Sequence, residues 1–578
     1  MNSKKIFIQS RPFQLLVIFI ASLSLKLLIF FAATDPILFL KYPYFAEKLA
    51  KGIDIGERIL DLSPLYLYVN LLFYKIFGKN WEGLALIQIF VGSLNCLLVY
   101  LIGEKIFNRT LGFIAAFLLT LYGNLTLIEL TLEPETFVLF FNSLALLALI
   151  KNRDRSPIDR VAWPWILPGF LLGLSIITKP NALLLLPAAF IWIWMGNASP
   201  ILKVKAAVFL LLAAALVVSP VTIRNYSKFK DFVLITADGG KVFYHGNGPG
   251  STGMERADLP DQGFREEGQN DPDYAHTLFR QAARNATGRL LSPSECAHFW
   301  RNYTLNYIEA NPFSALYLEV KKFIYFWGNY EVHDIDSVYK NYRTIQTWPL
   351  LPFGILSVLG IFGMVLARRE FYRAFLLYYV VFVYLISVLI FFAATRYRLP
   401  AAPVLAIFAA YGLLSTGSQW RNNQRANFFL YIGICVGIWI AINLPLRQTI
   451  AAFDRWQQAT RIHYSLGGNF YFQRRFYQEA AQEYQKAVAL EPNFAPAHNG
   501  LGKSYALLNE KQKAEEHFRK VIELAPGMDQ GYMNLGLLYV LRGQSEQGVP
   551  FLEKALALNP RNKKVQEELR KLKHPSKD

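Results

Sequence analysis

The sequence has only three cysteines among its 578 residues, and their positions exclude a disulfide framework or a cysteine metal cluster. Cys96 and Cys435 lie inside apolar runs, and Cys296 stands alone in a polar segment. A disulfide scaffold needs paired cysteines, and a zinc site needs closely spaced ligands. We therefore expect neither feature in this protein.

The sequence also lacks the local motifs of many soluble enzymes. It shows no nucleophile elbow, phosphate-binding glycine loop, paired metal-binding histidines or dinucleotide fingerprint. Acidic residues are scarcer than basic ones, 42 against 60, which gives a net charge of +18. No basic-aromatic module accompanies this charge, so a nucleic-acid partner is not expected. No redox cofactor is implied, and although a divalent cation is compatible with the chain, no ligand set for one is evident.

Long apolar runs dominate what is present. The chain is 53% hydrophobic with a mean hydropathy of +0.24. A spanning helix needs about 20 mostly apolar residues. The first run has no small-residue cleavage site after it, so we expect it to be an anchor. About eleven spans are predicted, at 13–33, 83–103, 110–126, 134–150, 163–178, 181–195, 204–220, 349–367, 374–394, 400–416 and 427–446.

Basic residues in alternate loops predict the orientation, because cytoplasmic loops collect Lys and Arg. They place the N-terminus inside and the segments 34–82, 127–133, 221–348 and everything after 447 outside. This assignment requires Pro64–Phe77 to be an interfacial helix, since it is too short to span. Phe323–Trp327 is interpreted in the same way. The basic residues are Lys4, Lys5, Arg11, Lys105, Arg109, Lys151, Arg153, Arg155, Arg160, Lys203, Lys205, Arg368, Arg369, Arg373, Arg421 and Arg425.

The C-terminal part repeats at a fixed period. Gly468, Gly502 and Gly536 are 34 residues apart, and so are Pro492, Pro526 and Pro560, and Tyr471, Tyr505 and Tyr539. This period, with small residues at helix crossings and Pro at the turn, indicates tetratricopeptide repeats. We expect an α-solenoid over 463–574 after a linker at 447–462, with 562–572 as a capping helix. Its usual use is to bind a peptide or protein; the alternative is a purely structural module.

Charged residues beside the outer span ends are the candidate chemistry. Lys179, Arg224, Arg396 and Arg398 are unexpected on that face and suit an anionic group such as a lipid phosphate; the alternative is snorkelling. Lys26 lies within the first span and either faces a polar cavity or snorkels. Asp35 and Glu133 are candidate bases for an acceptor hydroxyl, with Glu129 and Glu135 nearby. The alternative for each acid is a solvated loop charge.

Several segments resemble, in order, the C-type superfamily of membrane glycosyltransferases. The nearest likeness is to its bacterial branch related to protein O-mannosyltransferases and aminoarabinose transferases, which includes members with tetratricopeptide tails. The likeness covers about residues 13–420. It rests on Tyr42-x3-Ala46-x2-Leu49-x2-Gly52, Ser63-Pro64-Leu65-Tyr66, Leu132-Glu133-Pro134, Thr178-Lys179-Pro180, Arg224-Asn225, His245-Gly246-Asn247 and Tyr397-Arg398-Leu399-Pro400.

The resemblance implies transfer of a sugar from a polyprenyl-phosphate carrier outside the cytoplasm. It implies a catalytic aspartate about four residues before Tyr42, where this chain has Leu38. Either Asp35 does this work, or Glu47 substitutes, or the protein is inactive. Glu133 matches the second acidic position, and Lys179 and Arg398 match basic positions suited to carrier phosphate. His245 and Asn247, from the quoted motif, join Arg224 and Arg396 as candidate substrate-binding residues.

The sequence therefore predicts an all-α polytopic membrane protein with a glycosyltransferase-like domain over 1–446. We expect it in the inner (plasma) membrane, with the repeats outside. Its predicted partners are the lipid carrier and a protein or peptide bound by the repeats. The acceptor is a protein, lipid or glycan. Two other classes stay open: an inactive scaffold for envelope or polysaccharide assembly, and a lipid-linked saccharide transporter or polymerase.

Overall fold

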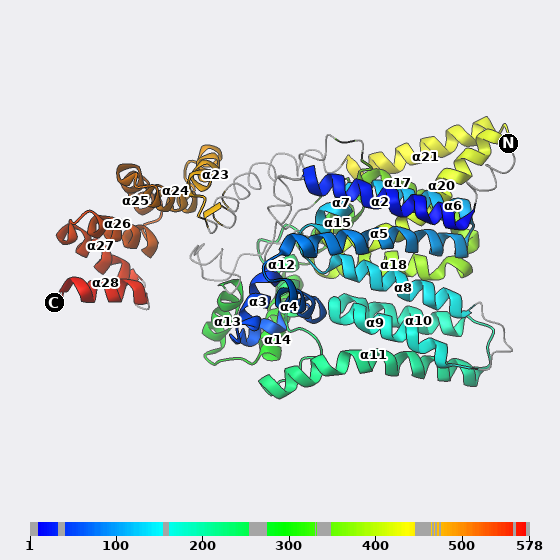
Figure 1. Cartoon of the computed structure of the whole chain (residues 1–578), viewed down its shortest axis with the longest axis horizontal. Coiled ribbons are helices and arrows are strands. Elements are labelled where there is room, and N and C mark those ends of the chain that lie inside the picture. The colour runs from blue at the N-terminus through cyan, green and yellow to red at the C-terminus, as the bar shows by residue number, and fades with distance from the viewer. Residues whose placement is uncertain are drawn as a thin grey trace. The chain divides into compact units, whose positions relative to one another are not determined.

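Helices form every regular element that the structure describes, which confirms the predicted fold class (Figure 1). The computed structural model describes residues 10–32, 41–153, 161–253, 274–329, 331, 348, 350–444, 464, 468, 471–472, 475–558 and 562–573. The chain divides into two compact units. One comprises 1–259 and 279–446, and the other comprises 260–278 and 447–578.

A bundle of long apolar helices forms the body of the first unit. Apart from the 7-residue α7, these helices carry 10 to 30 residues with little charge, so burial or lipid must surround them. The bundle helices are α2 (Arg11–Ala32), α5 (Trp81–Ile106), α6 (Arg109–Leu121), α7 (Gly123–Glu129), α8 (Glu135–Arg153), α9 (Ile166–Thr178), α10 (Leu185–Trp194), α11 (Pro200–Phe229), α17 (Phe353–Leu366), α18 (Phe371–Ile390), α20 (Ala402–Arg421) and α21 (Arg425–Asn443).

Shorter elements complete the first unit. Figure 1 shows α3, α4, α12 and α14 gathered at one end of the bundle, beyond the long helices. The shorter helices are α3 (Lys41–Ala50), α4 (Pro64–Phe77), α12 (Gly239–Asn247), α13 (Tyr274–Thr287), α14 (Pro293–Ala310), α15 (Pro312–Trp327) and α19 (Thr395–Arg398). The 3-10 turns are η1 (Gly56–Leu60), η2 (Trp163–Trp165), η3 (Pro180–Leu184), η4 (Ala367–Glu370) and η5 (Leu399–Ala401).

Seven described helices are long and apolar enough to cross a membrane, or eight if the pair α6–α7, bent by 61°, counts as one span. One of the seven, the stretch Phe353–Ile390, folds back on itself. Tyr378 Oη donates to Met364 O at 2.6 Å, whereas residues 14 apart in a straight helix lie about 21 Å apart. Each predicted range overlaps a helix, but the number eleven stays a prediction.

The basic residues of separate predicted loops meet at one end of the bundle. Arg11 and Arg109 both pair with Glu104, at 3.1 and 2.9 Å. We call this the basic end. Two further contacts there are Arg153 Nη1 to Tyr372 O at 3.0 Å and Arg373 Nη2 to Lys105 O at 3.4 Å. The contacts agree with one shared face for these loops, and the orientation of that face in a membrane stays a prediction.

Close helix packing in the bundle depends on small residues. A Cβ on Gly363 of α17 would lie 1.8 Å from Phe408 O of α20, so no other residue fits without a backbone shift. Small residues at such crossings let apolar helices approach closely where no hydrophobic effect drives association in lipid. The bundle therefore fixes the ends of its helices, and with them the loops at the end opposite the basic end.

The second unit repeats a helix pair every 34 residues. Helices α24 and α26 begin at Ala495 and Asp529, and α25 and α27 begin at Lys511 and Ser545. A Cβ on Gly502 would lie 2.6 Å from the Phe518 ring, as expected at a helix crossing. Its helices are α23 (Tyr477–Leu490), α24 (Ala495–Leu507), α25 (Lys511–Leu524), α26 (Asp529–Leu541), α27 (Ser545–Leu558) and α28 (Lys563–Lys573). The boundaries 447–462 and 463–574 stay predictions.

Candidate active site

A tight turn between α7 and α8 presents two acidic residues at the end of the bundle opposite the basic end. Glu133 lies in the turn and Glu135 opens α8; they are 2% and 0% exposed. The helix N-terminus favours the Glu135 carboxylate, because unpaired N–H groups and the helix dipole are positive there. Leu132 adopts φ of 53°, in the left-handed region that a leucine rarely occupies. The chain therefore holds this turn in a costly conformation.

Two cations from distant segments face these carboxylates. Arg396 Nη1 lies 3.3 Å from Glu133 Oε2, and Lys179 Nζ lies 2.5 Å from Glu135 Oε1. Lys179 ends α9, and its ammonium also lies 4.3 Å from the centre of the Tyr397 ring. Three predicted site residues, Glu133, Lys179 and Arg396, are thus brought together. Glu135 joins them, although sequence reasoning placed it only in an acidic cluster.

Each carboxylate keeps one oxygen without a partner. Glu133 Oε1 and Glu135 Oε2 are buried and accept no hydrogen bond within the described residues. Burial raises the pKa of Glu133 to about 7; Arg396 opposes this shift and the nearby Glu135 carboxylate adds to it. A carboxylate with a pKa near neutrality and an unpaired oxygen is chemically suited to accept a proton from a hydroxyl.

Lys41 is a site residue that sequence reasoning missed. It opens α3, and its ammonium lies 5.8 Å from the centre of the Tyr42 ring and makes no ion pair or hydrogen bond among the described residues. Burial lowers its pKa; Glu133 and Asp238 are close enough to act against this, and Arg396 adds to it. Lys41 directly precedes Tyr42 of the motif quoted above. That adjacency is the signal that could have found it.

The predicted acid Asp35 lies outside the described residues, so its contacts are not part of this description. Its rival Glu47 is described, and it faces away from any such role. Glu47 Oε1 pairs with Lys51 at 2.6 Å and with Lys79 at 3.0 Å, in a solvent-exposed cluster. The first of these pairs has the i, i+4 spacing that supports an exposed helix.

Arg398 lies apart from Glu133, although it is only two residues from Arg396. Its side chain is buried, and Nη1 donates to the carbonyls of Tyr325 and Gly328 at 2.7 and 2.9 Å. Nη2 pairs with Glu331 at 2.7 Å. A cation suits the C-terminus of α15, where carbonyls are unpaired. These contacts assign Arg398 a role in holding α15 and α19 together.

The remaining predicted residues lie on α11 and α12. Arg224 Nη1 donates to Tyr68 Oη at 3.1 Å, which joins α11 to α4. Asn247 accepts from Lys322 at 2.6 Å and donates to Ile390 O at 2.9 Å, which joins α12 to α15 and α18. Within the described part of the chain, neither residue contacts Glu133. Their substrate-binding roles stay predictions.

His245 is a partly buried histidine on α12. Its ring lies edge-on to Phe279 with centroids 4.9 Å apart, and its Nδ1 has no partner within the described residues. Burial lowers the pKa of His245 to about 4, and the Lys241 cation adds to this. His245 is therefore neutral near pH 7. Its role in binding substrate stays a prediction.

No group of three His, Cys, Asp or Glu residues in the described ranges is arranged to hold a metal ion. The unpaired oxygens of Glu133 and Glu135 supply two oxygen ligands at most, while hard divalent cations usually take six or more. The described residues therefore offer no complete protein ligand set for a divalent cation. Mg²⁺ can nevertheless bind through one or two carboxylates together with waters and a substrate phosphate.

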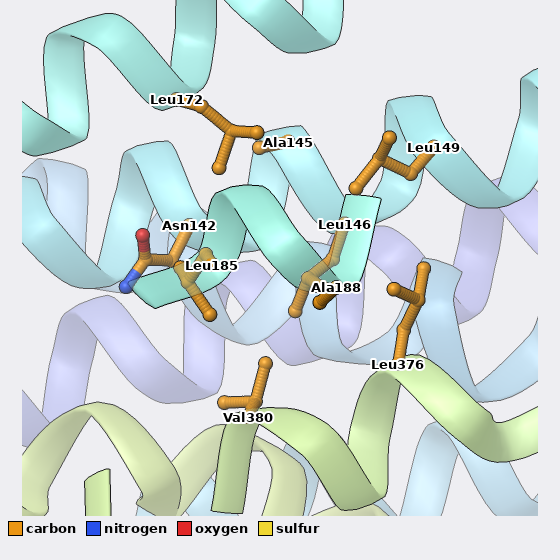
Figure 2. Close-up of a pocket in the computed structure, with 9 residues that line it drawn as sticks. All are labelled: Asn142, Ala145, Leu146, Leu149, Leu172, Leu185, Ala188, Leu376 and Val380. Carbon is orange, nitrogen blue, oxygen red and sulfur yellow. The ribbon is translucent and has the colours of Figure 1, made fainter. Parts of the chain in front are cut away.

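A small cavity lies within the bundle, away from these residues (Figure 2). It encloses about 10 Å³, which is enough for roughly one water molecule. A sugar or phosphate group does not fit there. Its lining comes from α8, α9, α10 and α18, and consists of Asn142, Ala145, Leu146, Leu149, Leu172, Leu185, Ala188, Leu376 and Val380.

Comparisons with known proteins bear on this site. Residues 61–223 match the family described as dolichyl-phosphate-mannose-protein mannosyltransferase. This range contains Glu133, Glu135 and Lys179. Residues 468–509, 495–528 and 529–562 match tetratricopeptide families. A search of curated proteins found no significant match.

Among solved structures, the chain is similar to the Archaeoglobus fulgidus oligosaccharyltransferase. In its complex with zinc and sulfate, identity is 15% over 74% of this chain, with a TM-score of 0.42. For the complex of AglB with an inhibitory peptide and a dolichol-phosphate, the values are 16%, 81% and 0.43. The chain covers 52% and 58% of those chains. MamA matches with 20% identity over 28% of this chain and 91% of its own, at a TM-score of 0.17.

All three TM-scores are below 0.5, so these structural similarities carry no argument on mechanism. The family matches support the predicted resemblance, because they fall on the two regions where sequence motifs predicted a glycosyltransferase-like domain and repeats. The predicted resemblance is therefore confirmed. Residues 61–223 therefore carry a mannosyltransferase-family domain, and residues 468–562 carry tetratricopeptide repeats.

Proposed function

We propose that this protein transfers a sugar from a polyprenyl-phosphate carrier to a hydroxyl acceptor at the end of the bundle that carries Glu133. One observation carries the proposal. A buried carboxylate with an unpaired oxygen stands beside cations within a mannosyltransferase-family domain. The acceptor is a protein, lipid or glycan. The site faces the extracytoplasmic side of the inner (plasma) membrane, and the N-terminus lies in the cytoplasm.

The reaction divides into two bond changes. The acceptor oxygen forms a bond to the anomeric carbon of the sugar, and the bond from that carbon to the carrier's phosphate oxygen breaks. The hydroxyl proton passes to a carboxylate, Glu133 or Asp35, and the carrier leaves as a phosphate monoester. The unpaired Oε1 of Glu133 is an oxygen to which that proton can go. A positioned general base of this kind contributes about 10²–10⁴-fold to the rate.

Three cations around Glu133 suit the leaving phosphate. Lys179 pairs with one oxygen of Glu135, and Arg396 pairs with one oxygen of Glu133. A bound phosphate would therefore share these two cations with the carboxylates. Lys41 has no such commitment, and we include it as a phosphate ligand. Charge developing on the leaving oxygen is stabilised most by fixed cations in a site that excludes water. Among the described residues, the two acids and three cations of this site carry a net positive charge, which favours binding of an anion.

The repeats would bind a protein or peptide partner, or the acceptor itself. The family matches over 468–562 support a protein-binding module, because each helix pair adds to a continuous concave surface. The identity of the ligand is left to experiment.

The test measures consumption of a polyprenyl-phosphate-linked sugar by the full-length protein in membranes. We expect the variant that removes the proton-accepting acid, Glu133→Gln or Asp35→Asn, to lower the rate by about 10²–10⁴-fold, the usual loss when a general base is removed. The other variant should lower the rate less. The matched control is Glu47→Gln, another change of a carboxylate to a carboxamide, which should retain the wild-type rate because Glu47 pairs with exposed lysines instead. If the wild type consumes no donor, the proposal fails. If the wild type consumes donor and neither acid variant changes the rate, the chemistry assigned to these acids is wrong. If the wild type and all variants are equally slow, the scaffold interpretation is favoured.

A further inference from the structure

A buried ion pair joins two bundle helices just before the turn that carries Glu133. Lys26 of α2 and Glu129 of α7 are 1% and 0% exposed. Lys26 Nζ donates to both carboxylate oxygens of Glu129, the bond to Oε2 being 2.6 Å long. The sequence left two alternatives for Lys26, namely facing a polar cavity or snorkelling. Lys26 does neither, because its ammonium is held by a residue 103 positions away.

The backbone of Glu129 is fixed as firmly as its side chain. Gln88 Nε2 of α5 donates to Glu129 O at 2.6 Å. Gln88 Oε1 in turn accepts from Tyr66 Oη of α4. Residue 129 is therefore tied to α2 through its side chain and to α5 and α4 through its carbonyl. Four residues later comes Glu133.

The segment between them needs such a restraint. Leu132 has a left-handed φ of 53° and is fully buried. The left-handed conformation is unfavourable for an L-residue with a side chain, so the surrounding structure must hold it. The helix also ends here, after the 61° bend between α6 and α7. A free segment would relax, and Glu133 would move away from Arg396.

Gly92 of α5 makes the room for this pair. A Cβ at this position would lie 1.9 Å from Glu129 Oε1 and 2.6 Å from Lys26 Nζ. Three helices thus meet at a point where two charges and one missing side chain fit together. Charges inside a membrane bundle are costly and are usually functional. An apolar pair would fill this volume without fixing how the end of α7 is oriented. The ammonium of Lys26, which donates to both oxygens of Glu129, does fix that orientation.

We propose that Lys26 and Glu129 are positioning residues, which hold the turn 130–134 so that Glu133 faces Arg396. The role in catalysis rests on the proposed function, and the restraint on the turn does not. Neither residue touches the substrate in this scheme. They act through Glu133, and loss of either would misplace its carboxylate. A displacement of about 1 Å in a catalytic group can lower a rate by about 10²-fold.

The experiment compares Lys26→Met, Glu129→Gln and Gly92→Ala with a matched control, Ser93→Ala, in the full-length protein. Ser93 is also buried on α5, but its hydroxyl bonds only Ile89 O of its own helix, at 2.9 Å. We expect the three variants to lose about 10²-fold in kcat with the KM for the lipid-linked sugar changed less than about threefold, as for a misplaced catalytic group. Ser93→Ala should match the wild type. The reversed pair Lys26→Glu with Glu129→Lys should recover at least about tenfold of the loss, if the ion pair itself matters.

Amide hydrogen exchange over residues 130–133 gives a second readout that needs no activity. It should be faster in the three variants and unchanged in Ser93→Ala, because exchange follows local opening. If Lys26→Met fails to fold, Gly92→Ala keeps both charges and decides the question. Unchanged exchange and unchanged kcat in Gly92→Ala would overturn the inference. If the wild type consumes no donor, the proposed function fails while the exchange measurement still tests the restraint.

Discussion

At the scale of single residues, Glu133 should set the pH dependence of transfer. Burial raises its pKa to about 7, well above the ordinary value of 4.5. A base works only when deprotonated, so kcat/KM should rise with pH and level off above about 7. Arg396→Gln removes a cation that lowers this pKa, so it should move the acidic limb to higher pH. A rate that does not change with pH around 7 in the wild type would contradict Glu133 as the base.

Truncation of Arg398 should destabilise the fold. Arg398 is buried against Glu331, and removing one partner of a buried pair costs about 3–5 kcal/mol. Arg398→Ala should therefore lower the melting temperature of the detergent-solubilised protein and its abundance in membranes. A wild-type melting temperature in this variant would contradict the structural role.

Lys179→Ala should instead weaken donor use while the protein stays folded. Its ammonium is partly exposed and lies beside the acids rather than within the bundle. A lost charge-assisted hydrogen bond costs about 1.5–3 kcal/mol, or roughly ten- to a hundredfold in kcat/KM. Steady-state kinetics with the lipid-linked sugar would measure this. Unchanged kinetics would mean that Lys179 serves only to neutralise Glu135.

At the scale of elements, helix crossings in the repeats should be sensitive to added volume. A Cβ at Gly502 would lie 2.6 Å from the Phe518 ring, so Gly502→Val should push α24 and α25 apart. Overpacking of this kind typically costs about 1–3 kcal/mol. Limited proteolysis of the C-terminal region should become faster. The control Gly527→Ala, where no atom lies within 4 Å of the added Cβ, should be cut at the wild-type rate.

The predicted elements follow from patterns that act locally. Each of the eleven predicted apolar ranges overlaps a helix. Apolar surroundings, whether lipid or protein, require the backbone N–H and C=O groups to hydrogen-bond within the segment. Pro64–Phe77, too short to span, is a helix of 14 residues. The bend at η4 could also be read locally, since Arg368 and Arg369 interrupt the apolar sequence. The bend between α6 and α7 falls at Tyr122, whose ψ of 90° leaves the helical region, directly before Gly123.

At the scale of the whole molecule, orientation is the prediction with the widest consequence. The basic end gathers loops that should face the cytoplasm, since such loops collect Lys and Arg. A reporter active only outside the cytoplasm, fused after Lys577, should be active, and one fused after Arg155 should be silent. The opposite pattern would remove the extracytoplasmic placement of Glu133 as well as that of the repeats.

The sequence alone determined the helical class, the approximate positions of the bundle helices, the 34-residue repeats and the family resemblance. Each depends on the order and spacing of residue types along the chain, which is visible without coordinates. It also found Glu133, Lys179 and Arg396 as charges at span ends, although it ranked them with Arg398. Asp35, on which the sequence argument also relied, lies outside the described residues.

Only the tertiary structure decided which charges meet. Arg396 and Arg398 are two residues apart, yet one pairs with Glu133 and the other with Glu331. Lys26 meets Glu129 across 103 residues, in a gap that Gly92 leaves open. The partner of a side chain depends on the face of its helix and on which helix packs there. Long-range packing sets both of these, and a linear pattern does not record them.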